Sequence, residues 1–78
     1  MTAKDMFNEL GYIQDLNNSY CMGYYKRIAE TKMRTITFVK DYKYMTFIDT
    51  DNNCSITLKE LQAINKQVEE LGWLDKGE

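Results

Sequence analysis

The sequence predicts an α+β domain of two layers, in which an N-terminal and a C-terminal helix pack on a three-stranded antiparallel sheet. Three observations predict this fold class. Helix start and stop signals bracket residues 2–11 and residues 57–72. Residues 19–48, between them, alternate aromatic or β-branched side chains with other residues, as strands do. The links within this middle segment are short, so the strands form an antiparallel meander, and two helices with one apolar face each can cover one side of it.

The N-terminal helix is expected near residues 2–11 and begins at a capping box. Thr2 and Asp5 are spaced so that each side chain can bond the other residue's backbone amide. Gly11 follows the last apolar residue and can adopt the left-handed backbone that ends a helix. The apolar face of this helix consists of Ala3, Met6, Phe7 and Leu10.

The C-terminal helix is expected near residues 57–72 and carries the same signals. Thr57 and Glu60 form its capping box, and Gly72 ends it. Five apolar residues recur at spacings of about 3.6 and therefore lie on one face. They are Leu58, Leu61, Ile64, Val68 and Leu71.

Three strands are expected between the helices. We predict them at residues 20–28, 35–39 and 42–48, separated by a polar break at residues 29–33 and a turn at residues 40–41. The turn before the first strand consists of Asp15, Asn17, Asn18 and Ser19. The predicted core of the domain is Met6, Phe7, Leu10, Ile36, Phe38, Leu61, Ile64, Val68 and Leu71. The helices leave the second face of the sheet uncovered, and we expect lysine, arginine, threonine and some of the tyrosines there.

Length and composition favour one ordinary globular domain. We expect the 78 residues to form a single domain over residues 1–78, with a flexible tail from about residue 75. No segment has the length and hydrophobicity of a signal peptide or a membrane span, so we expect a cytoplasmic protein with no membrane partner. Cys21 and Cys54 are too few for a disulfide framework and are expected to be reduced thiols.

Residues for catalysis are missing from the sequence. It contains no histidine, and neither serine nor cysteine stands in a nucleophile motif. Its four glycines form no phosphate-binding loop. We therefore expect a protein that is not an enzyme and has no catalytic, cofactor-binding or metal-binding residue.

Residues 49–60 resemble the calcium loop of an EF-hand. Oxygen-bearing side chains stand at loop positions one, three, five, seven, nine and twelve, and Ile56 matches the apolar eighth position. Cys54 replaces the glycine of the sixth position, and a strand precedes the loop where an EF-hand has a helix. Calcium binding is therefore kept as an alternative, and a polar loop that leads into a capping box is the preferred interpretation.

The middle of the chain is basic and aromatic. Residues 26–45 carry six basic and two acidic side chains, whereas the segments on either side are acidic. Tyrosines among cations on an exposed sheet can stack on single-stranded nucleic acid, and they can equally form a protein-binding surface. The candidate interaction surface consists of Tyr24, Tyr25, Arg27, Arg34, Tyr42 and Tyr44.

Both ends of the chain resemble a family of small, mostly uncharacterised proteins of Firmicutes phages and prophages. The resemblance covers residues 1–12 and residues 56–73, and residues 63–73 are its most specific part. It implies a phage accessory protein in a bacterial cytoplasm and no known catalytic or binding residue. Because the chain lacks catalytic groups, we expect it to bind a protein, either a host protein such as a defence component or a second copy of itself. Nucleic-acid binding through the basic aromatic face is the alternative.

Overall fold

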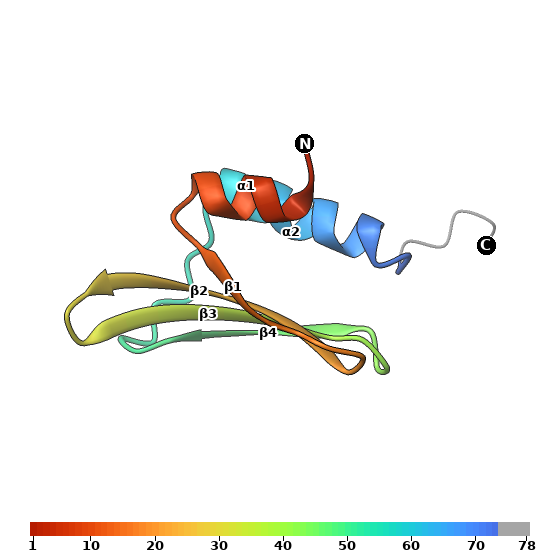
Figure 1. Ribbon diagram of the computed structural model, residues 1–78. Helices are drawn as coiled ribbons and strands as arrows, with labels where there is room; N and C mark the ends of the chain where they lie inside the picture. The colour runs from red at the N-terminus through yellow and green to blue at the C-terminus, as the bar shows by residue number, and fades with distance from the viewer. Residues whose placement is uncertain (74–78) are drawn as a thin grey trace.

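A computed structural model describes residues 1–73 and has two layers (Figure 1). Its elements are α1 (Ala3–Glu9), β1 (Ile13–Asn17), β2 (Cys21–Ala29), β3 (Lys32–Val39), β4 (Tyr44–Asp49) and α2 (Leu58–Glu70). Both helices lie on the same face of one antiparallel sheet with strand order β1-β2-β3-β4. The α+β class and the antiparallel meander are confirmed. The sheet has four strands, however, and the prediction of three was wrong.

Both helices begin at the predicted capping boxes. Thr2 and Asp5 exchange bonds with each other's backbone amides, and so do Thr57 and Glu60. The two helix ends are also as expected, since Gly11 and Gly72 have φ angles of +92° and +76°. These signals act within a few residues of chain, and this is why the sequence predicts them so well.

The missed strand, β1, occupies most of the segment that was predicted to be a turn. A bulge between Gln14 and Leu16 lets this segment pair with β2. The actual turn is shorter and is closed by the Asn18 side chain, which accepts bonds from the amides of Tyr20 and Cys21. The third predicted strand also begins later than expected, at Tyr44, because Lys43 has a φ angle of +55° and belongs to the preceding turn.

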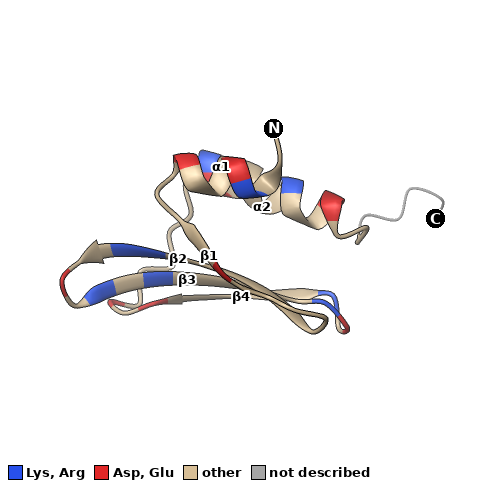
Figure 2. Cartoon of the chain, viewed as in Figure 1, with Lys and Arg blue, Asp and Glu red and all other residues tan. Residues whose placement is uncertain are grey.

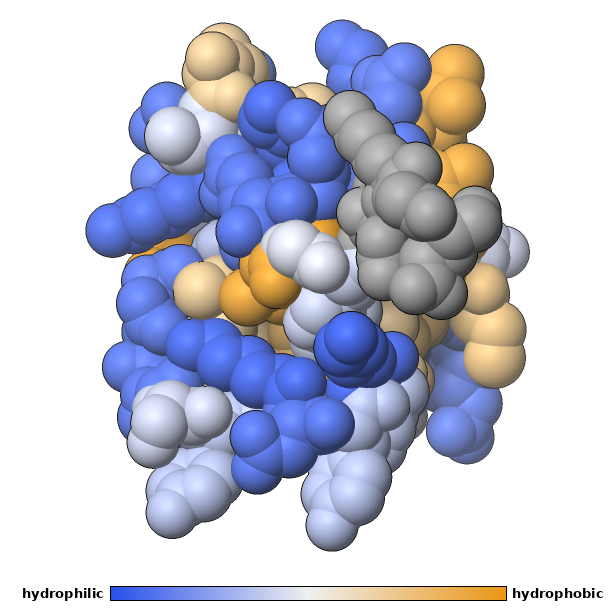
Figure 3. Space-filling view, turned by 90° about the vertical axis from the view of Figure 1, so that its right-hand side faces the viewer, coloured by the Kyte–Doolittle hydropathy of each residue, from blue (hydrophilic) through white to orange (hydrophobic). Residues whose placement is uncertain are grey.

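The core lies between the helices and the sheet and is largely aromatic. The Phe7 and Tyr24 rings stack at 4.1 Å between centroids, and Phe38 meets both rings edge-on. Figure 3 looks onto the end of the molecule where β3 and β4 are joined, and hydrophobic residues show between the two layers there. The buried hydrophobic residues are Ala3, Phe7, Tyr12, Tyr24, Ile36, Phe38, Ala63 and Ile64.

The core prediction is right for most positions and wrong for Leu61. Phe7, Ile36, Phe38 and Ile64 are buried. Met6, Leu10, Val68 and Leu71 are partly buried against them. Leu61 is 54 % exposed, because α2 instead turns Glu60, Ala63, Ile64 and Gln67 toward the sheet.

Two buried polar residues of α2 explain this rotation of the helix. The Tyr12 hydroxyl donates to Glu60 Oε2 at 2.5 Å, and the Tyr24 hydroxyl donates to Gln67 Oε1. A buried polar group is tolerated where it finds a hydrogen-bond partner. Tyr12, just before β1, and Tyr24, in β2, therefore hold two polar side chains of α2 in the core, and the leucines at the start of α2 lie beside the core.

Candidate interaction surface

The register of the strands assigns each side chain to one of the two faces of the sheet. Met22, Phe38 and Met45 lie opposite one another across β2, β3 and β4, as do Tyr24, Ile36 and Phe47. These two rows face the helices. Because side chains alternate along a strand, the residues between them form the second face, which no helix covers. We call it the outer sheet face, and it consists of Ile13, Leu16, Cys21, Gly23, Tyr25, Arg27, Met33, Thr35, Thr37, Val39, Tyr44, Thr46 and Ile48.

The outer sheet face carries few charges. One row across all four strands consists of Ile13, Tyr25, Thr35 and Ile48. Arg27 is the only charged residue that the register pairs on this face, and the Asp15 carboxylate of the β1 bulge lies beside Gly23 on the same side. Figure 2 shows the charged residues of the sheet gathered near the strand ends, apart from the acidic position in β1. The face therefore differs from our expectation of a surface rich in lysine and arginine.

Gly23 allows the bulged strand β1 to lie close to the outer sheet face. A Cβ atom at Gly23 would lie 3.3 Å from Leu16 Cβ and 3.4 Å from Asp15 Oδ1, which is tight contact. The Leu16 and Asp15 side chains thus occupy the space that a larger residue at position 23 would need. This is the close approach that a glycine within a strand often marks.

Two of the six predicted surface residues do not belong to an exposed surface, and this part of the prediction needs correction. Tyr24 is fully buried between the layers, where its ring stacks on Phe7. The Arg34 side chain is only 11 % exposed and lies on the helix side, next to Asp49 and Glu60. The sequence could not show which of two adjacent tyrosines, Tyr24 or Tyr25, faces inward, because the alternation fits either choice.

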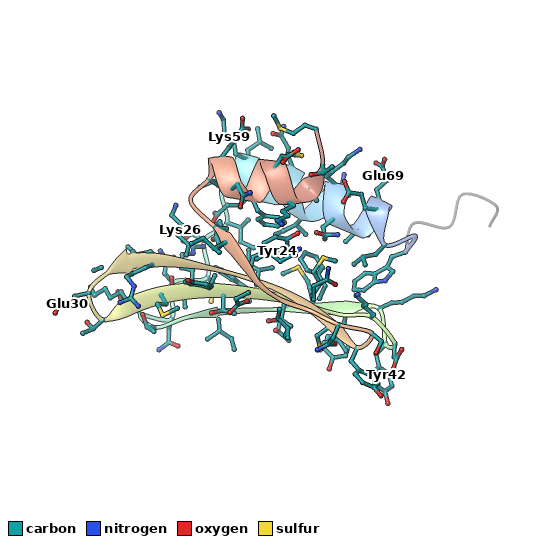
Figure 4. The ribbon with its side chains drawn as sticks, in the orientation of Figure 1. Tyr24, Lys26, Glu30, Tyr42, Lys59 and Glu69 are labelled. Carbon is teal, nitrogen blue, oxygen red and sulfur yellow. The ribbon has the colours of Figure 1, made fainter. Side chains whose placement is uncertain are left out.

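The other four predicted residues are accessible. Tyr25 and Arg27 lie on the outer sheet face in β2, with Tyr25 partly exposed. Tyr42 is 78 % exposed in the turn before β4, and its ring stacks on that of Tyr44 with 6.3 Å between centroids. Figure 4 shows that Tyr42 projects from the side of the sheet away from the helices, whereas Tyr24 points between the layers. The pair of tyrosines thus extends the outer sheet face at one end.

The basic residues of the middle segment do not gather on one exposed face. The Lys26 ammonium lies on the helix side, 5.6 Å from the centre of the Tyr12 ring, as Figure 4 also shows. Lys32 pairs with Asp51 at 3.1 Å, and Lys40 bonds Asn17 and the carbonyl oxygen of Asn18. A nucleic-acid backbone is held by a continuous line of cations. The described residues show no such line among the tyrosines of the sheet.

Arg34 is the centre of a buried polar cluster at one end of the molecule. Its guanidinium donates to the carbonyl oxygen of Ser55 at 2.6 Å, and it lies 3.6 Å from Asp49 Oδ2 and 3.7 Å from Glu60 Oε2. Its carbon Cζ is 4.6 Å from the centre of the Phe47 ring, a cation–π distance. This cluster connects β3, β4, the loop and the start of α2, so its role is structural.

The cluster shifts the pKa values of two of its members. Burial alone would raise the pKa of the Glu60 carboxyl, but bonds from the Thr57 amide and the Tyr12 hydroxyl, with the charge of Arg34, outweigh burial and lower it. Burial, together with the bond to Glu60, raises the pKa of Tyr12 far above its usual value. Glu60 is therefore ionised and Tyr12 is neutral near neutral pH.

The acidic loop resembling an EF-hand uses its oxygen atoms within the protein. Asp49 Oδ1 accepts bonds from the amides of Asp51 and Asn53, and Glu60 accepts from Thr57 and Tyr12. The left-handed residue of the loop is Asn52, with φ of 59°, and not Cys54. The loop follows strand β4, whereas an EF-hand loop follows a helix. Within residues 1–73, no group of three or more acidic or cysteine side chains is arranged to hold a metal ion.

One hollow on the helix layer has a volume of about 520 Å³ and is open to solvent. Glu9 and Lys59 are its only charged residues, and no serine, threonine or cysteine lines it. Cys21 and Cys54 are free, with Cys54 exposed in the loop.

Comparisons with known proteins assign no family to this chain. No protein family, no curated protein and no solved structure matches it. Among the described residues, neither helix has the length and hydrophobicity needed to cross a membrane. The functional argument therefore depends on the surface itself.

Sequence reasoning missed several residues of the outer sheet face, notably Ile13, Leu16 and Val39. Ile13 and Leu16 were hidden because β1 was taken for a turn. The alternation in the predicted strands did contain a signal for the rest: Tyr44, Thr46 and Ile48 alternate with Met45 and Phe47. Had it been known that Phe47 faces the helices, this alternation would have placed Tyr44, Thr46 and Ile48 on the opposite face of the sheet.

Proposed function

We propose that this protein acts without catalysis, by binding another protein through the outer sheet face. The observation that carries the proposal is that this face is both apolar and uncovered. Ile13 is 55 % exposed and Ile48 is 62 % exposed, at opposite ends of one row across the sheet. The centre of a protein interface is poor in charged residues, and large exposed apolar patches on small domains mark contact sites.

The tyrosines of this face support the proposal. Tyr25 lies in the middle of this row, and the stacked pair Tyr42 and Tyr44 lies at one end of the outer sheet face. Tyrosine is enriched among the residues that contribute most to binding, because its ring adds apolar contact and its hydroxyl can bond the partner. The partner surface that fits is therefore apolar, with hydrogen-bonding groups toward its edge.

The resemblance of both chain ends to phage and prophage proteins adds a biological context. In that context the partner is a protein of the bacterial host, for example a defence component that this chain would inhibit by covering it. The place of action would be the bacterial cytoplasm.

The test is capture of a partner from a bacterial host lysate by three immobilised forms of the chain. These are the wild type, Ile13→Lys on the outer sheet face, and Leu58→Lys on α2. Both replaced residues are more than half exposed, so each variant retains the fold, which circular dichroism verifies. We expect the wild type and Leu58→Lys to recover one protein in stoichiometric amount, and Ile13→Lys to recover at least about tenfold less.

Two results would count against the proposal. In one, the wild type recovers no stoichiometric partner. In the other, Ile13→Lys recovers the same amount as the wild type, so that binding does not involve the outer sheet face.

A further inference from the structure

The two edges of the sheet are protected very differently. Edge strands expose unpaired backbone groups and are usually protected by bulges, charges or proline. β1 has such protection, since it contains a bulge and Asp15. β4 pairs with β3 without a bulge, and its residues 44–48 include no charge and no proline.

The backbone of β4 has groups free to pair with another strand. Thr50 N–H donates to the carbonyl oxygen of Met33, and bonded pairs alternate along an antiparallel ladder. Tyr44, Thr46 and Ile48 therefore bond β3, and the backbone groups of Met45 and Phe47 point to the free edge. In the described chain, no backbone bond joins the loop over residues 52–57 to residues 44–48. Beside Phe47 and Ile48, this loop leaves a hollow of about 190 Å³.

The flank of α2 above this edge is also apolar. α1 lies next to β1, and its Ala3 amide donates to the Glu70 carboxylate of α2. The side of α2 that carries Glu70 therefore faces α1. With 3.6 residues per turn, Leu61 lies on the side of α2 opposite Glu70, and it therefore points away from α1 and toward the side of β4. It is 54 % exposed, whereas Glu60 and Gln67 of the same helix are buried. Figure 1 shows both helices on one face of the sheet, with α1 in front, above the β1 edge, and α2 behind it.

We propose that a second copy of this chain pairs with the β4 edge in antiparallel orientation, related to the first copy by a two-fold axis at Thr46. In this arrangement Met45 lies opposite Phe47 of the second copy, and Tyr44 lies opposite its Ile48. Lys43 lies opposite Asp49 of the second copy, whose carboxylate is 7 % exposed and faces Arg34 of its own copy, so the paired segments over residues 44–48 bring no charges together. The α2 helices of both copies lie beside each other on one eight-stranded sheet, and Leu61 is covered.

The structure favours a second copy as the occupant of this edge, for two reasons. The segment over residues 44–48 complements itself, apolar against apolar and threonine against threonine, which is what a two-fold interface requires. The described chain also exposes eleven large hydrophobic residues and buries only eight hydrophobic residues. Domains this small often obtain the missing burial by association. The dimer shares Tyr44, Thr46 and Ile48 of β4 with the outer sheet face and leaves Ile13, Leu16 and Tyr25 uncovered. It does not depend on the proposed function.

The experiment measures the molar mass of the intact chain by sedimentation at a series of concentrations. We expect a dimer for the wild type. Thr46→Lys places two ammonium groups together at the axis, and Leu61→Lys places charge on the flank of α2. Both are expected to weaken dimerisation at least about tenfold, which corresponds to about 1.4 kcal/mol. The matched controls Thr31→Lys in the β2–β3 turn and Gln62→Lys on the far side of α2 should remain dimers.

Hydrogen exchange provides a second measurement that needs no variant. The amides of Met45 and Phe47 should become more protected as the wild-type concentration rises. A wild type that stays monomeric at millimolar concentration overturns the proposal. A dimer that survives both Thr46→Lys and Leu61→Lys, or that dissociates in Ile13→Lys alone, also overturns it, because the two copies then meet elsewhere.

Discussion

At the scale of single residues, the two buried tyrosine hydroxyls explain features that hydrophobicity alone would not predict. Tyr12, in the link between α1 and β1, holds Glu60 of α2, and Tyr24, in β2, holds Gln67 of α2. A hydrogen bond between buried partners contributes modestly to stability, whereas a buried group left without its partner costs more. The tyrosines therefore align α2 on the sheet as well as filling the core.

The substitution Tyr24→Phe tests this role. It leaves Gln67 without its partner in the core, and we expect the free energy of unfolding to fall by about 1–3 kcal/mol. Tyr25→Phe on the outer sheet face is the matched control, with a change within about 0.5 kcal/mol. Urea denaturation measures both. Equal effects at the two positions would mean that the inward tyrosine is wrongly assigned.

The pH dependence of stability tests the cluster around Glu60. Its pKa is lower in the folded chain than in the unfolded chain. The stabilisation is therefore fully present above the ordinary glutamate pKa, and it disappears as the pH falls through the lower, folded-state pKa. We expect the wild type to lose more stability than Glu60→Gln between neutral pH and about pH 3. At neutral pH the variant should be less stable by about 1–3 kcal/mol. Parallel pH profiles of the two proteins would contradict the assigned role of Glu60.

At the scale of elements, helix ends were predictable from the sequence and the strand count was not. Capping boxes and terminal glycines act over a few neighbouring residues, so Thr2, Gly11, Thr57 and Gly72 identify both helices. β1 was missed because its polar residues match a turn, and only its pairing with β2 makes it a strand. The burial of Glu60 was equally invisible, because it depends on Tyr12, which is 48 residues away in the chain.

The face of α2 that meets the core can be tested by two truncations. Ile64 is buried, so Ile64→Ala should lower the free energy of unfolding by about 2–5 kcal/mol through loss of burial and a residual cavity. Leu61 is more than half exposed in one copy of the chain, so Leu61→Ala should cost less than about 1 kcal/mol under conditions where the chain is monomeric. Chemical denaturation at low protein concentration measures both values. A larger loss for Leu61→Ala would restore the original prediction that Leu61 belongs to the core.

At the scale of the whole molecule, the two layers leave two apolar surfaces without a cover. The helices cover one face of the sheet, and the outer sheet face remains open. The edge formed by β4 and the flank of α2 is open as well. The sequence indicated an uncovered sheet face, but only the register shows that this face is apolar and that the cations lie elsewhere. The fold thus leaves apolar side chains exposed on the outer sheet face and at the β4 edge, and we propose that these are contact surfaces.

The most direct test of the central claim maps the contact surface by NMR, using methyl groups of isoleucine, leucine and valine in the complex with a captured partner. The proposal predicts that the methyl signals of Ile13, Leu16 and Val39 shift on binding, because all three lie on the outer sheet face. The signal of Leu58 on α2 should change little compared with the free chain at the same concentration. Shifts confined to Leu58 and Leu61, with the methyl groups of the outer sheet face unchanged, would contradict the claim.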